Sequence, residues 1–171
     1  MRRLTLMRHA DAQWKDPEIA DFARPLNKRG IAEAEAMARR LVELDLLPDL
    51  LLASPARRTL QTADIVVREL AINPRQLRFE EALYLAAAKD LLDIIRMTGP
   101  RVPHLMVIAH NPGISELARQ LAPDNGINGL STGAVCSITF DSPDWLSLAP
   151  ERVRGVLSEA PLSRLFTSLF A

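Results

Sequence analysis

Short apolar runs alternate along the chain with longer segments in which apolar residues recur every three or four positions. The short runs predict strands at 3–8, 48–54, 76–79, 104–110, 134–140 and 153–158. The longer segments predict helices at 28–45, 55–71, 88–97 and 112–122. Strands that alternate with helices are typical of a mainly parallel sheet with helices on both faces. We therefore predict a three-layer α/β/α sandwich, although the order of the strands does not follow from the pattern.

The apolar positions of the first two predicted helices indicate which face of each helix packs on the sheet. A helix that covers a core carries its apolar side chains as a stripe along one side. In the first helix this stripe is formed by Ile31, Ala34, Ala38 and Leu41. In the second helix it is formed by Leu60, Ala63, Val67 and Leu70. We expect both stripes to be buried.

The composition is that of an ordinary globular protein. Of the 171 residues, 48% are hydrophobic and 25% are charged, which fits one domain over residues 1–171. Lys and Arg together number 21, as do Asp and Glu together, so the formal net charge is zero. Nucleic acids and anionic membranes usually bind proteins with a basic excess. We therefore expect neither of them as a partner.

The cysteine content and the first residues bear on the compartment. Cys136 is the only cysteine, so no internal disulfide can form, and its apolar surroundings at 134–140 predict an unreactive buried thiol. The opening stretch "MRRLTLMRHADA" is apolar only briefly and is interrupted by Arg8, so it resembles neither a signal peptide nor a membrane span. We expect a cytoplasmic protein.

Polar and basic residues follow three of the predicted strands. The junctions read "LMRHA" with Arg8 and His9, "LLASPARR" with Arg57 and Arg58, and "VIAHNPG" with His110. In a parallel sheet the carboxyl ends of the strands meet at one edge, and sites form outside that edge. We therefore expect these side chains to lie together.

Two of these junctions also predict helix starts that point at the same edge. Ser54-Pro55 and Asn111-Pro112 each place a favoured N-cap residue before a proline, which is favoured at the first helical position. The amides at a helix N-terminus attract anions. Both helix ends would thus favour a negatively charged ligand.

Arg57 and Arg58 stand in the first turn of the second helix, where cations oppose the helix dipole. The cost is about 0.3–1 kcal/mol for each cation. Either both arginines extend outward into water, or a bound anion offsets the repulsion. Together with Arg8 and the histidines, the second interpretation predicts a phosphate pocket.

The histidines at this edge add the possibility of chemistry. An imidazole beside guanidinium groups stays neutral, and a neutral ring keeps a nitrogen lone pair that can attack phosphorus. Metal binding by His9 and His110 is not supported, because no carboxylate pair or HExxH-like spacing accompanies them and the arginines would repel a cation. His104 lies at the starting end of its strand, away from the predicted pocket, and we expect it to be structural.

The three junctions together resemble the histidine phosphatase superfamily, also called phosphoglycerate-mutase-like. The motifs are Arg8-His9, "SPARRTLQTA" at 54–63 and "AHNP" at 109–112. The short chain and "RPLNKRG" at 24–30 resemble the small bacterial SixA-type phosphohistidine phosphatases. The resemblance implies the phosphoglycerate-mutase-like fold, with His9 as the phosphorylated nucleophile, Arg8 and Arg58 as phosphate clamps and His110 as a donor to the phosphoryl oxygens. It favours Arg58 over Arg57, because the family places its second arginine after Ser-Pro and two further residues.

Three positions are less well defined by the resemblance. The family has glycine where this chain has Ala10; alanine adopts positive φ less readily, so its amide could be set differently toward the phosphate, but we expect Ala10 to be a tolerated variant at a phosphate-binding position. Relatives place an acid after the third strand, where Glu80 and Glu81 stand in "FEEALY"; Glu81 is the candidate, although both could be solvated loop residues. Arg24 could reach the same edge or form a surface ion pair.

The function implied by the resemblance is that of a phosphatase without metal or other cofactor that forms a phosphohistidine intermediate. No long insertion that could cover a small molecule stands between residues 80 and 103, where "GPRVP" closes a short helix. An uncovered pocket suits phosphohistidine on a protein better than a small metabolite. A phosphatase or mutase for a small phosphorylated metabolite and a non-catalytic phosphate-binding module remain the alternatives.

Overall fold

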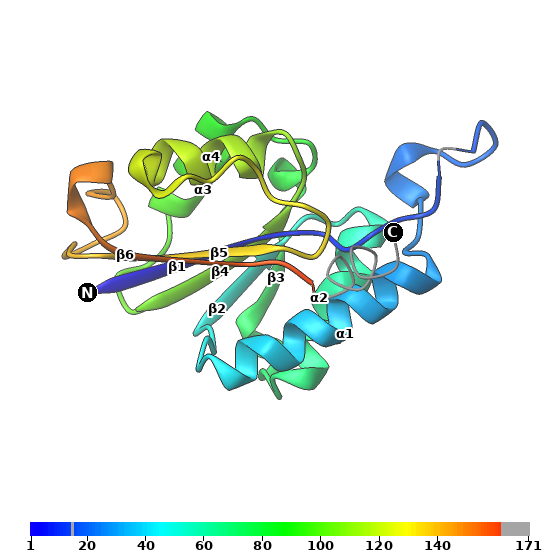
Figure 1. Cartoon of the computed structure of the whole chain (residues 1–171), viewed down its shortest axis with the longest axis horizontal. Coiled ribbons are helices and arrows are strands. Elements are labelled where there is room, and N and C mark those ends of the chain that lie inside the picture. Colours follow the sequence, from blue (N-terminus) through cyan, green and yellow to red (C-terminus); the bar gives the residue numbers. More distant parts are fainter. Residues whose placement is uncertain (15, 162–171) are drawn as a thin grey trace, which may run out of the picture.

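The computed structural model describes residues 1–14 and 16–161. Within them lies a sheet with the strand order β3-β2-β4-β1-β5-β6 (Figure 1). The strands are β1 Arg2–Arg8, β2 Leu50–Ala53, β3 Leu77–Phe79, β4 His104–Ala109, β5 Val135–Phe140 and β6 Val153–Glu159. Strands β1 to β4 pair in parallel, whereas β5 and β6 are antiparallel to their neighbours. The predicted mainly parallel sheet is confirmed.

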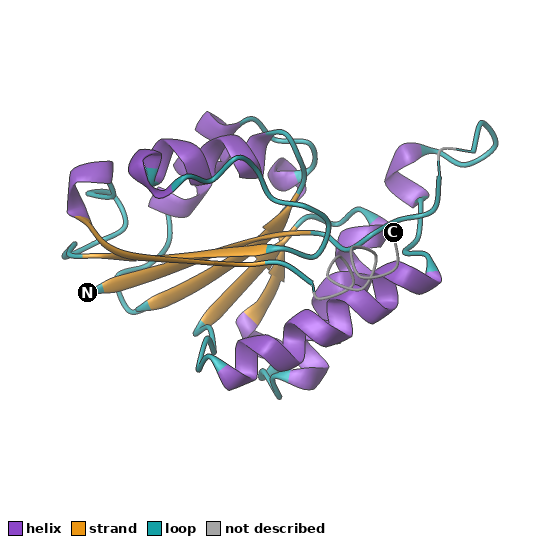
Figure 2. Ribbon diagram, viewed as in Figure 1, coloured by secondary structure: helices purple, strands orange, loops and turns teal. Residues whose placement is uncertain are grey.

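Helices cover both faces of this sheet (Figure 2). Helices α1 Lys28–Glu43 and α2 Arg57–Glu69 lie on one face, and α3 Ala88–Arg96 and α4 Gly113–Leu121 lie on the other. Each helix pair encloses its own cluster of buried apolar side chains against the strands. The three-layer α/β/α architecture is therefore confirmed. No helix within the described residues is both long enough and apolar enough to span a bilayer.

The predicted inner face of α1 is largely right, and that of α2 is right in part. In α1, Ala34, Ala38 and Leu41 are buried, whereas Ile31 is 41% exposed. In the predicted stripe of the second helix, Ala63 and Leu70 are buried, whereas Leu60 and Val67 are only half-buried. The buried residues of α2 are Arg58, Thr59, Thr62, Ala63, Ile65 and Val66. The first turns of α2 lie at the strand ends, so polar side chains are turned inward there.

The predicted N-caps are also wrong. Helices α2 and α4 both begin after the proline of their junction, and neither first turn receives a side-chain cap. Ser54 instead lies 2.8 Å from a ring nitrogen of His110. The Asn111 side chain donates to the Leu130 carbonyl at 3.0 Å and accepts from Ser115, and the Asn111–Pro112 peptide is cis. These polar side chains hold the strand-end loops together, so they are not available to cap the helices.

Candidate active site

The sheet register brings the three predicted junctions to one place. Arg8 at the end of β1 pairs with Ala109 at the end of β4, and Ala53 at the end of β2 pairs with Ile108. The residues that follow these strands surround a hollow of about 230 Å³, here called the strand-end hollow. Its lining includes Arg8, His9, Asp21, Arg24, Arg58 and His110. The structure thus gathers the four basic and imidazole residues predicted for the site, and adds Asp21 and Arg24.

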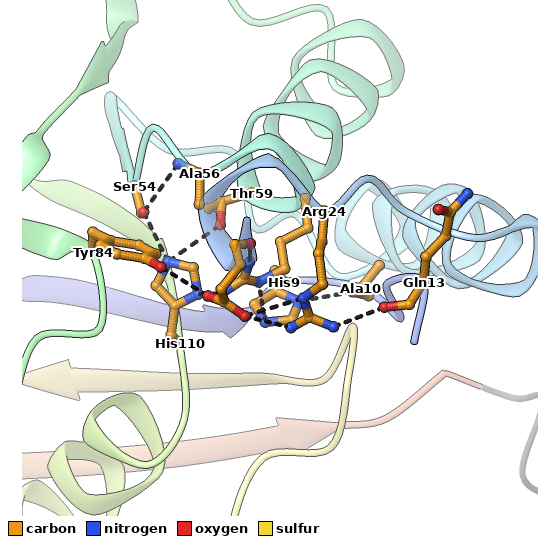
Figure 3. Close-up of polar contacts among 11 residues, drawn as sticks. His9, Ala10, Gln13, Arg24, Ser54, Ala56, Thr59, Tyr84 and His110 are labelled. Carbon is orange, nitrogen blue, oxygen red and sulfur yellow. Dashed lines mark hydrogen bonds and ion pairs between the residues drawn. The ribbon is translucent and has the colours of Figure 1, made fainter. Parts of the chain in front are cut away.

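His9 has a defined tautomer in this hollow. Its Nδ1 lies 2.8 Å from the carbonyl oxygen of Ala10 (Figure 3). A carbonyl can only accept, so Nδ1 carries the ring hydrogen and Nε2 keeps its lone pair. The Nε–H of Arg58 donates to that Nε2 at 3.2 Å. His9 therefore presents an unprotonated nitrogen to a cationic surface.

The surroundings of His9 also hold it neutral. Burial is the main cause that lowers its pKa, to about 4, and the positive charges of Arg58, Arg8 and Arg24 act in the same direction. The hydrogen bond to Ala10 opposes them only in part. The ring is thus a potential nucleophile at neutral pH.

Arg58 is the most fully engaged arginine of the hollow and is only 2% exposed. Besides His9, it donates through Nη1 to the backbone oxygen of Asp21 at 2.6 Å and through Nη2 to the Asp21 carboxylate at 3.0 Å. The same Nη2 lies 3.3 Å from Nδ1 of His110. Arg57 points away and is exposed. Of the two adjacent arginines, the structure therefore places Arg58 in the hollow, as the sequence predicted.

His110 faces His9 across the hollow, with the ring centroids 5.2 Å apart. Its Nδ1 accepts from Arg58, so the hydrogen is on Nε2 and is donated to Ser54 Oγ at 2.8 Å. Burial, then the charges of His9 and Arg58, lower the pKa of His110 to about 3. Without a bound anion, both histidines of the hollow are therefore neutral.

Arg8 and Arg24 complete the positive lining. Arg8 is half-buried and donates to the Leu130 carbonyl at 3.3 Å. Arg24 donates from Nε to Asp21 at 3.0 Å and from Nη1 to the Gln13 carbonyl at 2.7 Å (Figure 3). Arg24 thus both lines the hollow and forms an ion pair, the two possibilities that the sequence left open.

Asp21 is the residue of the hollow that sequence reasoning missed. It opens the short 3-10 helix Asp21–Ala23 and accepts from Arg24 and Arg58. Burial would raise its pKa, but the hydrogen bond from Tyr84 and the charge and hydrogen bond of Arg58 outweigh burial and lower the pKa to about 2. Asp21 is therefore a permanent carboxylate that orients two arginines.

Tyr84 supports this arrangement from the connection after β3. Its hydroxyl donates to Asp21 Oδ2 at 2.8 Å. Its ring packs edge-on against His110, with the centroids 5.5 Å apart, and against Phe22 at 5.0 Å. Tyr84 thus links Asp21 to the second histidine.

The structure does not bring Glu81, the predicted acid, into the hollow. Glu81 begins the 3-10 helix Glu81–Leu83 and is exposed, as is Glu80, which accepts from the Ala82 amide at 3.4 Å. Leu83 and Tyr84 take the inward positions of this turn. The carboxyl groups are left on its outer side, so the proposed role of Glu81 loses its geometric basis.

Ala10 also differs from the expectation. Its amide donates to Thr62 Oγ1 at 3.1 Å, so it is not directed into the hollow as a phosphate donor. Ala10 is not among the residues with positive φ, so alanine meets no backbone strain there. The departure from the family's glycine is therefore accommodated by the local conformation.

Two groups predicted to be structural lie away from the hollow. His104 begins β4 and contacts Thr5 Oγ1 at 2.9 Å and the Leu47 carbonyl at 3.0 Å. Cys136 is buried, and burial raises the pKa of its thiol to about 11. Over residues 1–14 and 16–161, no group of three or more His, Cys, Asp or Glu side chains is arranged to hold a metal ion.

The buried histidines predict a loss of stability in mild acid. Burial lowers the pKa of His104 to about 4, as it does for His9, and that of His110 to about 3. As the pH falls below about 6.5, the unfolded chain therefore binds these protons first, and the folded state loses up to about 2 kcal/mol per histidine by pH 5. Asp21, with its pKa lowered to about 2, loses its contribution only below about pH 4.

Urea unfolding at pH 7, 6 and 5 measures this effect. We expect the free energy of unfolding to fall steadily over this range. His104→Asn should make the dependence on pH less steep, whatever it does to the stability at pH 7. A free energy of unfolding that is constant between pH 7 and 5 would contradict the lowered pKa values.

The sequence was compared with protein-family models and with known proteins. Residues 4–83 match the family model of the histidine phosphatase superfamily (branch 1). An uncharacterised chloroplast protein of Arabidopsis thaliana is 35% identical over an alignment of 129 residues that covers 71% of this chain. The match covers 59% of that relative, so the chain spans about three fifths of its length.

Two solved structures resemble nearly the whole chain. A candidate phosphohistidine phosphatase SixA of Agrobacterium tumefaciens has a TM-score of 0.80 and 28% identity, over 94% of this chain and 98% of that one. The protein histidine phosphatase SixA in complex with tungstate has a TM-score of 0.78 and 24% identity, over 95% and 99% of the two chains.

Proposed function

Because the chain belongs to the histidine phosphatase superfamily and has a SixA-type structure, we propose that it hydrolyses phosphohistidine on proteins, without a metal ion, through a phosphorylated His9. The observation that carries this proposal is the state of His9. Its Nε2 lone pair faces the hollow because Nδ1–H is bonded to Ala10. Three arginines line the same hollow and can hold the phosphoryl oxygens.

In the first step, His9 Nε2 attacks phosphorus as the bond from phosphorus to the substrate nitrogen breaks. An incoming phosphoryl oxygen takes over the Nε–H of Arg58, which releases the lone pair that this donor now contacts. The guanidinium groups of Arg8, Arg24 and Arg58 offset the charge on the transferred group. Nδ1 keeps its hydrogen, so the phosphorylated ring is a cation whose charge the Ala10 carbonyl stabilises.

In the second step, a water oxygen attacks phosphorus and His9 leaves. Since Nδ1 has kept its hydrogen, the ring departs as a neutral imidazole, and the proton of the water goes to the phosphate or to solvent. The negative charge of the bound phosphoryl group raises the pKa of the neighbouring His110. His110 can then carry a second hydrogen and donate it to a phosphoryl oxygen from the nitrogen that now contacts Arg58.

The carboxyl groups of the hollow support phosphohistidine as the substrate. Within the described lining these groups are Asp21, whose pKa is lowered to about 2, and Asp11, which accepts from Asn27 at 2.9 Å. Asp21 cannot serve as an acid near neutral pH. A phosphohistidine can leave as neutral imidazole once its own ring is protonated, whereas an alkyl phosphate ester depends more on an enzyme acid.

A substrate comparison tests this proposal. We expect kcat/KM for a phosphohistidine peptide to exceed that for phosphoglycerate and sugar phosphates by at least about tenfold, because the esters depend more on an enzyme acid. The assays should contain EDTA, run near neutral pH and be corrected for spontaneous loss of phosphohistidine. A phosphoglycerate or sugar phosphate turned over about ten times faster than every phosphohistidine peptide would favour the metabolite alternative. Binding of phosphate without turnover of any substrate would favour the non-catalytic module.

A further inference from the structure

A second hollow, unrelated to the strand-end hollow in its lining, runs along the free edge of β3. It has a volume of about 780 Å³ and is here called the β3 groove. Its floor is formed by Leu50, Leu52, Ile94 and Val102, which belong to or pack against the core under α3 and α4. Strand β3 ends the strand order, so within the described residues its outer side has no neighbouring strand (Figure 1). The groove is therefore an open surface with an apolar base.

Three arginines line this groove, and all three are exposed: Arg75, Arg78 and Arg101. They come from the 3-10 helix Pro74–Gln76, from β3 and from the turn before β4. Among the described contacts, none of the three guanidinium groups is bonded to a carboxylate. Arg39 and Arg57 also lack a carboxylate partner among the described contacts, so the distinguishing feature of the groove is that three such guanidinium groups line one hollow.

The two carboxylates in the lining of the groove, Asp49 and Glu80, are not bonded to these arginines. Asp49 accepts from the backbone amide of His104 at 2.9 Å, and Glu80 accepts from that of Ala82 at 3.4 Å. Both acidic side chains are thus directed to the protein's own backbone. The three guanidinium groups remain available to an external anion.

Protection of a sheet edge explains only part of this pattern. A charged residue on an edge strand prevents pairing with another sheet. Arg78 meets that need, because Leu77 packs toward the α1 and α2 side and the next side chain projects to the α3 side. Arg75 and Arg101 lie outside the strand, so edge protection does not account for them.

We propose that the β3 groove binds an acidic, extended segment of a protein partner. Guanidinium groups bind carboxylates with two parallel hydrogen bonds, and three of them fit a segment with several Asp or Glu residues. Met97 is 85% exposed and Phe79 is 45% exposed, and both offer apolar contact to the same segment. The apolar floor and the exposed Met97 and Phe79 suit the side chains of a protein segment better than the phosphate backbone of a nucleic acid or a lipid headgroup.

The position of the groove links it to the strand-end hollow. Ala82 lines the groove, and Leu85, three residues later, lines the strand-end hollow. One turn of chain therefore borders both surfaces. On the proposed function, the partner is the phosphorylated protein itself, with its acidic segment in the groove while its phosphohistidine enters the hollow.

The first test measures binding alone. The probe is a fluorescein-labelled peptide of six glutamates, titrated with protein and followed by fluorescence anisotropy. We expect binding that weakens with added salt, is about tenfold weaker for Arg78→Ser/Arg101→Ser, and is unchanged for Lys28→Ser/Arg39→Ser on α1 and for His9→Ala. Equal binding to the groove variant and the wild type, or equal binding of an uncharged peptide, would overturn the proposal. So would tighter groove-dependent binding of single-stranded DNA or phosphatidylserine vesicles.

The second test separates the groove from the proposed function. Two phosphohistidine peptides are compared, one of which carries six glutamates beyond a flexible linker of about eight residues. We expect the acidic peptide to have a lower KM, and Arg78→Ser/Arg101→Ser to remove this advantage without changing hydrolysis of the plain peptide. Hydrolysis of both peptides with equal KM overturns the groove as a substrate surface and leaves the function intact. Failure to hydrolyse either peptide overturns the function, while the binding result decides on the groove.

Discussion

Replacing His9 by alanine should abolish turnover and remove the covalent phosphoryl label from the enzyme. The imidazole Nε2 is the attacking atom of the proposed mechanism, and its lone pair is set by the bond from Nδ1–H to Ala10. Loss of a nucleophile from a site that works as a unit typically costs about 10⁴-fold or more in kcat. Rapid quenching of the wild type should yield phosphate on the peptide that contains His9, stable in base and lost in acid.

Two matched variants make this result specific. His110→Ala should slow turnover and still form the label, because in the proposed mechanism His110 donates to the phosphoryl oxygens and takes no part in the bond being made. His104→Asn should leave both the rate and the label unchanged, since His104 lies at the opposite end of β4. A label that persists in a folded His9→Ala variant would assign the nucleophile to another residue.

The fold could be predicted because its signal is local and strong. The six residues of β4 are all buried and the five after His104 are apolar, and such a run marks a central parallel strand without further information. The strand order could not be predicted, because it depends on which strands pair after the helices have packed and not on the sequence of any one strand. The inner face of α2 was predicted only in part, because its first turns bury the polar residues Arg58, Thr59 and Thr62, which contact the strand-end residues rather than the apolar core. Departures from the apolar pattern thus coincide with candidate function.

Some residues of the candidate site could also be predicted from the sequence, and others could not. Arg8 ends β1, and His9 and His110 directly follow β1 and β4; the topology of a parallel sheet alone brings such residues to one edge. Asp21 comes from the connection between β1 and α1, whose path depends on bonds to distant residues such as Arg58. Nothing local distinguishes it from other acidic residues of that connection. Tyr84 stood in the stretch considered for an acid, but its role depends on its contact with Asp21.

Replacing Arg58 by alanine should lower kcat/KM by about 2–4 kcal/mol, or roughly 30- to 1000-fold, because a buried donor to transition-state charge is lost. Arg57→Ala is the matched control from the adjacent position. Its side chain is exposed, so we expect less than about a threefold change. Equal small losses for the two variants would mean that neither arginine contacts the phosphoryl group.

A variant of Asp21 tests the same role of Arg58, because Asp21 holds the Arg58 guanidinium in place. Its carboxylate holds Nη2 of Arg58 at 3.0 Å while Nε of the same guanidinium points to His9. Asp21→Asn should therefore lower kcat/KM by about tenfold in the wild type through misplacement of that donor. In the Arg58→Ala background the same change should cost much less, because there is no guanidinium left to orient. Kinetics of the two single variants and the double variant measure this coupling. Fully additive losses would show that Asp21 acts independently of Arg58, through Arg24 or through the loop that carries it.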